Sequence, residues 1–213
     1  MEKAVLLSVH PQWCERIADG GKTIEVRKTK PKLDTPFKVY IYCTNNKDML
    51  WILKESERES RLKITSIFTA KDVGGATKAN GKVIGEFVCD KIFEIEYRCG
   101  SYRCKGLTVL ENDRVASASK LSLCDLRSYL SCNNGYGWHI SNLVIYDKPV
   151  ELYKFHRECE RPECEDCSFF HFENTPNSYE GWCECDEKIS IKRPPQSWCY
   201  VSDTGINTSK GEN

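Results

Sequence analysis

The chain has 213 residues, 31 basic and 31 acidic side chains and 13 cysteines, and 40% of its residues are hydrophobic. This length predicts one large domain, or one domain with a small appendage, and the apolar content excludes a disordered chain. The first apolar run, Ala4–Val9, is too short for a secretory signal or a membrane span. We therefore expect a cytoplasmic protein with no membrane partner.

Hydrophobic periodicity predicts a series of short strands and an early helix. The strands are expected at 4–9, 23–28, 37–43, 82–96, 138–146 and 197–201. Pro11 suits the first position of a helix that runs to about Ala18 and ends at Gly20-Gly21. Residues 45–80 are charged and contain few apolar residues, so they are predicted to be irregular.

A second helix is expected over residues 122–130. Ser122 is its predicted N-cap, and Asp125 occupies the position of a capping-box partner. The expected apolar face consists of three leucines: Leu123, Leu126 and Leu130. Gly85 is a candidate β-bulge inside its strand. Short strands with two short helices predict a small, mainly antiparallel sheet that closes on itself.

The charged segment after the glycine pair suggests a binding site. On a strand of period two, Glu25 and Arg27 share one face, while Ile24 and Val26 share the other. If the apolar pair faces the core, Glu25 and Arg27 become neighbours, and Lys22 could swing over them. An arginine offers a fork to phosphate, and a glutamate can accept from a base amine. The alternative is an exposed ion pair on a solvated strand.

Four motifs in this order resemble those of the ASCH family, a branch of the PUA-like superfamily. They are Gly20–Arg27 (GGKTIEVR), Gly81–Phe87 (GKVIGEF), Gly137–Pro149 and Arg193–Val201. The first matches the family signature G-x-K-T-x-E-x-R. The last is similar to the ending of bacterial and phage-borne members that carry a cysteine-rich insert. The resemblance covers roughly residues 3–150 and 190–201.

This resemblance implies a fold, a cleft and a choice of activities. The fold would be α+β but mainly β, a PUA-like barrel with short helices at its rim. The family cleft has been proposed to bind RNA or a modified nucleoside. Some members are amidohydrolases that act on acylated cytidine, and others have been described as ribonucleases. The amidohydrolase branch has a Thr three residues after its Lys, whereas here Glu25 follows Lys22 at that spacing.

One residue of the pair Trp138 and His139 is expected to complete the candidate cleft. Trp138 and His139 follow a Gly-Tyr-Gly turn, and adjacent strand residues face opposite ways, so one is expected in the core and the other in the cleft. An exposed aromatic ring beside hydrogen-bonding groups is typical of base recognition. The alternative is a core tryptophan beside a surface histidine. Trp13 is expected to be a core or lid aromatic.

The cysteines and the charges divide the chain into modules. Five cysteines lie within 27 residues and have the spacing of a structural zinc site, in which four of them would bind the metal and His171 could substitute for one. These are Cys159, Cys164, Cys167, Cys183 and Cys185. Residues 151–187 carry an excess of eight negative charges, and residues 1–150 an excess of six positive charges. The zinc segment is therefore expected to be structural or to face a protein partner, whereas Cys43 and Cys89 are expected to be buried free thiols.

The sequence thus predicts four segments: a barrel at 1–150, an acidic zinc-binding insert at 151–190, a returning strand at 191–201 and a disordered tail at 202–213. The leading hypothesis is an RNA- or modified-nucleotide-binding module with a structural zinc site. Its ligand-binding residues would be Lys22, Glu25, Arg27, Trp138 and His139. One alternative is a hydrolase of a modified nucleoside or of RNA, with Lys22 and Glu25 as the catalytic pair. Another is a protein-interaction adaptor that uses the acidic segment.

Overall fold

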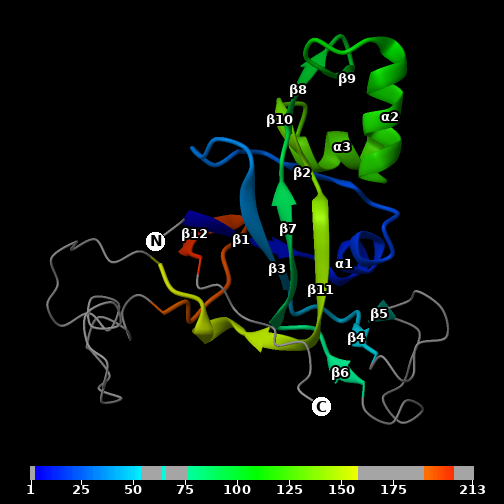
Figure 1. Ribbon diagram of the computed structural model, residues 1–213. Coiled ribbons are helices and arrows are strands. Elements are labelled where there is room, and N and C mark those ends of the chain that lie inside the picture. The colour runs from blue at the N-terminus through cyan, green and yellow to red at the C-terminus, as the bar shows by residue number, and fades with distance from the viewer. Residues whose placement is uncertain (1–2, 54–63, 66–75, 158–189, 204–213) are drawn as a thin grey trace, which may run out of the picture.

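The computed structural model describes residues 3–53, 64–65, 76–157 and 190–203 (Figure 1). Within these ranges the strands are β1 Lys3–Val9, β2 Ile24–Arg27, β3 Phe37–Cys43, β4 Trp51–Ile52, β5 Ile64–Thr65, β6 Thr77–Lys78, β7 Lys82–Cys89, β8 Ile92–Arg98, β9 Ser101–Cys104, β10 Gly135–His139, β11 Ser141–Glu151 and β12 Trp198–Ser202. The α-helices are α1 Pro11–Ala18, α2 Val109–Ser119 and α3 Leu123–Leu130. No described helix is long and apolar enough to cross a membrane.

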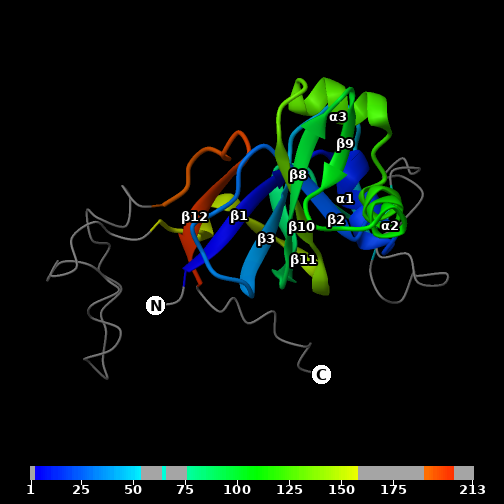
Figure 2. The same ribbon diagram turned by 90° about the horizontal axis from the view of Figure 1, so that it is seen from above.

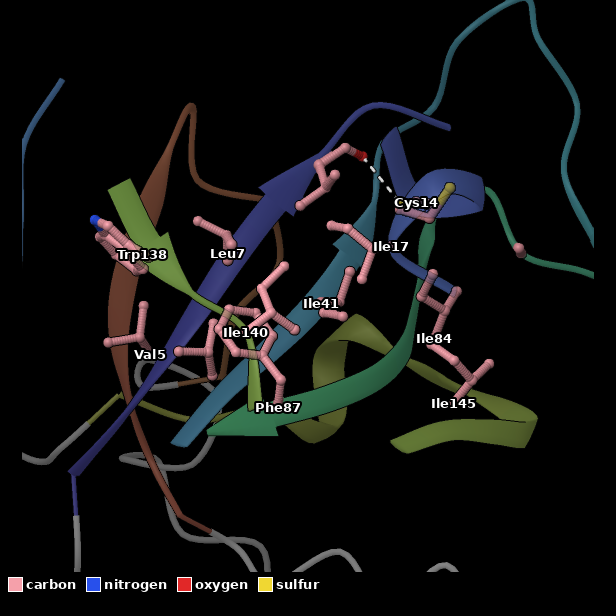
Figure 3. Close-up of a cluster of buried hydrophobic side chains, with 14 of the residues drawn as sticks. Val5, Leu7, Cys14, Ile17, Ile41, Ile84, Phe87, Trp138, Ile140 and Ile145 are labelled. Carbon is pink, nitrogen blue, oxygen red and sulfur yellow. Dashed lines mark hydrogen bonds between the residues drawn. The ribbon is translucent and has the colours of Figure 1, made fainter. Parts of the chain in front are cut away.

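The largest sheet has five strands in the order β11-β7-β3-β1-β12, and its strands β1 and β3 are buried on both faces. All neighbours are antiparallel except β1 and β3. Alternation along β1 explains the two buried faces, because Val5 and Leu7 belong to one apolar cluster and Ala4 and Leu6 to another. The first cluster includes residues of α1 and β10 (Figure 3). The second is closed by Leu152, Phe155 and Ile191.

The second sheet has the order β2-β10-β8-β9 and carries two helices on one face. Val26 and Ile95 pack there with Leu126 and Leu130 of α3. Seen from above, α2 and α3 lie away from β1 and β12 (Figure 2). Each helix begins with a reciprocal capping box, made by Thr108 with Glu111 for α2 and by Ser122 with Asp125 for α3. A small third sheet has the order β5-β4-β6.

The described strands form three open sheets, so the closed barrel expected from the sequence is not what they build. β11 and β12 stay at opposite edges of the five-stranded sheet, whereas closure would require edge strands to pair. Trp138 of β10 packs against Phe37 of β3 and Trp198 of β12, with ring centroids 5.9 and 6.0 Å apart. These large side chains fill the space between two layers, which stay separate as packed sheets.

Several predicted elements are confirmed and others need correction. The first helix ends as expected, and the ladder of β7 with β3 shifts register between Gly85 and Val83, which confirms the bulge. The stretch 82–96 is two strands, joined at Asp90 and Lys91. The predicted strand 138–146 is divided at Ile140 between β10 and β11, and β11 continues to Glu151.

Two further corrections concern the helices. The sequence reading did not predict α2, because its apolar residues do not repeat clearly at helical spacing. Its start nevertheless has a sequence signal, the capping pair Thr108 and Glu111. Leu123 is 43% exposed and does not belong to the apolar face of α3, whereas Leu126 and Leu130 are buried.

Candidate functional site: a buried charged cluster on β2

The turn after α1 fixes the position of Lys22. Gly20 adopts φ +75°, a left-handed conformation that glycine accepts without strain, and the Lys22 amide donates to the Arg16 carbonyl at 2.7 Å. The next residue, Thr23, donates its amide to the carbonyl of Ala118 at the end of α2 and accepts from the Ile140 amide. The start of β2 is therefore held by the preceding helix and by two segments that are distant in the sequence.

Lys22, Glu25 and Arg27 form one buried cluster. Arg27 Nη2 lies 2.8 Å from Glu25 Oε1, and Lys22 Nζ lies 3.3 Å from Glu25 Oε2. The three residues are 2%, 6% and 7% exposed, respectively. The predicted alternation along β2 is confirmed, because Ile24 and Val26 are buried on one face, where Val26 packs against the helices. The opposite face, which carries the charges, is buried as well.

The ammonium group of Lys22 has a complete set of close neighbours. It donates to the carbonyls of Ile24 at 2.9 Å and Ser119 at 2.6 Å, and it lies 5.1 Å from the centre of the Trp13 ring. Burial lowers the pKa of Lys22 below its ordinary value, although the charge of Glu25 opposes this shift. Trp13 is only partly buried, so a partly exposed aromatic ring contacts the buried ammonium.

The charges of the cluster do not balance, and one of its buried donors has no acceptor among the described residues. Two cationic side chains share one carboxylate, which leaves a formal excess of one positive charge when Lys22 is protonated. Arg27 Nη2 also donates to the carbonyl of Ser8 at 2.7 Å, but Arg27 Nε has no hydrogen-bond acceptor among the described residues. Glu25 Oε2 has only the 3.3 Å contact with the Lys22 ammonium among the described residues. Buried polar groups are almost always paired with protein, ordered water or a bound group, so the unpaired Arg27 Nε identifies a position where such a partner binds.

Trp138 borders this cluster, but His139 does not. Trp138 is the register partner of Glu25 on the neighbouring strand, so the two side chains share one face of the sheet. Its ring is fully buried, and Nε1 is a third polar atom without a described partner. His139 points to the other face and pairs with Asp90, whose Oδ1 lies 2.6 Å from Nδ1. Trp138 is thus the core member of the predicted pair, and His139 is the exposed one.

Three groups of the cluster were not assigned to it from sequence. Trp13 was expected only to be a core or lid aromatic, although its place in α1, just before the Gly-Gly turn, could have indicated proximity to Lys22. The carbonyls of Ser8 and Ser119 carry no sequence signal, because any residue supplies that group.

The five cysteines proposed to bind zinc lie within 158–189, outside the described residues. Among the described residues no group of His, Cys, Asp or Glu side chains could hold a metal ion. Cys43 and Cys89 are free and buried, as expected. Burial raises the pKa of the Cys89 thiol to about 12, so it remains protonated and unreactive at neutral pH.

No family model and no curated protein matches the chain. Solved structures of ASCH from Zymomonas mobilis resemble it at 14% identity; for one of them the similarity covers 96% of this chain and 92% of that chain, with a TM-score of 0.49. Two single-substitution variants of that protein give TM-scores of 0.49 and 0.48, with 95% and 94% of this chain and 92% and 89% of theirs covered. This likeness carries no argument about ligand or activity.

Proposed function

We propose that this protein is an RNA- or modified-nucleotide-binding module whose ligand is recognised at the cluster of Lys22, Glu25 and Arg27. The observation that carries the proposal is a buried donor, Arg27 Nε, that has no acceptor among the described residues, although Arg27 is ion-paired with Glu25. The second carboxylate oxygen, Glu25 Oε2, has only a 3.3 Å contact with the Lys22 ammonium in the described part of the chain. The edge of a nucleobase presents a neighbouring donor and acceptor, so it can satisfy both atoms. The excess positive charge favours an anionic ligand, such as a nucleotide.

The geometry also supplies an aromatic surface near the cluster. Trp13 is partly exposed and its ring lies against Lys22, so it is the group on which a bound base would stack. Trp138 is fully buried and forms an inner wall of the site, whereas His139 lies on the opposite face of the sheet. In this proposal Trp13 takes the stacking role that the sequence suggested for Trp138 or His139.

Direct titration of the full chain tests this proposal. Short single-stranded RNAs, with and without acylated cytidine, are added while Trp fluorescence or heat is measured at two salt concentrations. Affinity should fall with salt, and Arg27→Ala should weaken binding about tenfold or more, which corresponds to about 1.4 kcal/mol. Because Arg27 is buried, Arg27→Lys is measured beside it, with Lys82→Ala as a surface control. Salt-independent binding, or none, refutes the proposal.

A hydrolase is the second candidate, and one observation favours it. Burial lowers the pKa of Lys22 even though the Glu25 carboxylate, 3.3 Å from its ammonium group, opposes the shift, so a neutral amine is more accessible here than on a surface lysine. Purified protein should then release the acyl group from acylated cytidine or cleave short RNAs, and Lys22→Met should abolish turnover. Intact substrates after prolonged incubation exclude this activity.

A structural zinc ion in the cysteine-rich segment remains a proposal that rests on the sequence spacing alone. One equivalent of zinc should co-purify with the chain, and the double variant Cys164→Ser/Cys167→Ser should lose it. Metal-free protein with an unchanged melting temperature would contradict the site. The protein-adaptor alternative depends on the same segment and would be tested with the same variant.

A further inference from the structure

The buried cluster continues to the surface along one face of the second sheet. Arg27 is the register partner of Tyr136 on β10, and Tyr136 is the partner of Glu94 on β8. Residues directly opposite each other on neighbouring strands share a face, so Arg27, Tyr136 and Glu94 form a single row. The helices α2 and α3 cover the other face, where Val26 and Ile95 lie.

A cationic and aromatic surface occupies the outer part of this row. Tyr136 is half-buried, and Lys30 Nζ lies 5.2 Å from the centre of its ring. Lys30 and Lys105 both reach Glu94, with Nζ to oxygen distances of 3.4 and 3.5 Å. These distances are long for ion pairs, and both lysine side chains are exposed, so the pairs contribute little to stability. Both ammonium groups can therefore turn to another anion at small cost.

We propose that Tyr136, Lys30 and Lys105 form a subsite for the nucleotide adjacent to the one recognised at Arg27. The base of that nucleotide stacks on Tyr136, and the two lysines contact the phosphates that join it to its neighbours. This inference rests on the proposed function and makes it more specific. The ligand is a segment of single-stranded RNA with at least two nucleotides, not a free nucleoside.

Three observations favour this occupant over an acidic protein. An aromatic ring flanked by lysines combines stacking with phosphate contacts, which is the pairing that single-stranded nucleic acids use. Tyr136 is the direct neighbour of Arg27 on this face and is more exposed than Arg27, so a nucleotide next to one held at the cluster would lie against it. Glu94 contacts both lysines and can accept hydrogen bonds from base amines, whereas the carboxylates of an acidic peptide offer it no donor.

Chain length of the ligand tests the inference. The affinities of a ribonucleoside monophosphate and of single-stranded RNAs with two to six nucleotides are measured for the full chain. We expect the wild type to bind the short RNAs at least tenfold more tightly than the monophosphate. Tyr136→Leu keeps an apolar side chain on the core but removes the π face, and it should lose most of that gain. Lys30→Ala should lose part of it and lower the salt dependence.

Control variants outside the proposed subsite are measured in the same way. The controls are Tyr153→Ala and Lys82→Ala. Tyr153 is exposed just after β11, and Lys82 is ion-paired with Glu151. Neither substitution should change the affinity for the monophosphate or for the short RNAs. If the monophosphate and the short RNAs bind equally well, or if Tyr136→Leu keeps the full gain, the subsite is overturned while the proposed function stands. If inorganic polyphosphate competes as well as RNA, stacking on Tyr136 is overturned. If neither nucleotide nor RNA binds, the proposed function fails and the subsite fails with it.

Discussion

The same arrangement of charges occurs twice on one face of the second sheet, once in the interior and once at the surface. Glu25 is shared by Lys22 and Arg27 in the interior, and Glu94 is shared by Lys30 and Lys105 at the surface. The inner carboxylate pairs at distances down to 2.8 Å, whereas the outer one keeps its partners at 3.4 and 3.5 Å. The residue types are similar, so burial accounts for the difference between the two groups. Buried ion pairs are held in one geometry and are destabilising to break, whereas exposed ion pairs are weak and can exchange partners.

The largest expected effect concerns the stability supplied by each carboxylate. Glu25→Ala leaves two buried cations without their partner and should lower the free energy of unfolding by about 3 to 5 kcal/mol. Glu94→Ala removes only exposed pairs and should change it by less than about 1 kcal/mol. Urea unfolding followed by circular dichroism measures both. Equal effects of the two variants on the free energy of unfolding would contradict the difference between the buried and the exposed ion pairs.

Replacing the buried aromatic residue of β10 should likewise destabilise the protein more than replacing the half-buried one. Trp138→Ala empties a fully buried position between the two sheets and should cost about 3 to 5 kcal/mol of stability. Tyr136→Leu retains apolar contact with the core and should cost less than about 1.5 kcal/mol. The same unfolding experiment applies. A Trp138 variant as stable as the wild type would mean that this residue does not hold the sheets together.

A smaller effect should appear in the pH dependence of stability. The folded state lowers the pKa of Lys22 below 10.5, so burial of its charge opposes folding at neutral pH. As pH rises through the lowered folded pKa towards 10.5, this penalty disappears. The difference in unfolding free energy between the wild type and Lys22→Met should therefore shift in favour of the wild type from pH 7 to pH 10. The Lys30→Met variant provides the surface control, and a flat difference for Lys22→Met contradicts the burial of a charged amine.

The smallest effect should be the salt dependence of the two charge groups. Added salt screens exposed pairs more strongly than buried ones. Between low salt and 1 M NaCl, the small contribution of Lys30, obtained by comparison with Lys30→Ala, should vanish. The contribution of Arg27, obtained with Arg27→Lys, should remain nearly constant. A large salt effect on the Arg27 contribution would show that solvent reaches the inner cluster.

Periodicity and caps predicted the local elements that are governed by neighbouring residues. The helix at 11–18, the capping box of Ser122 with Asp125 and the bulge near Gly85 depend on local chemistry, and all are present in the structure. The path of α2 and the division at Ile140 depend on tertiary packing, which strand and helix periods do not encode.

In the candidate site, too, the local arrangement could be predicted from the sequence, whereas the tertiary packing could not. Alternation along β2 placed Glu25 and Arg27 together and left Lys22 within reach, as the structure has them. That face was expected to be an open cleft, yet it is buried, because the five-stranded sheet packs over it. This layer is assembled from strands at both ends of the described chain, with β1 paired to β12, so no local pattern could indicate it.

The most direct measurement of the central claim is the NMR signal of the Arg27 Nε–H group in uniformly 15N-labelled protein. The signal is assigned by its loss in Arg27→Lys and followed during titration with a short single-stranded RNA. If the orphan donor binds the nucleobase, its proton resonance should move downfield and saturate at the same RNA concentration as the binding isotherm. An Arg27 Nε–H signal that stays unchanged at saturating RNA would contradict recognition at the buried cluster.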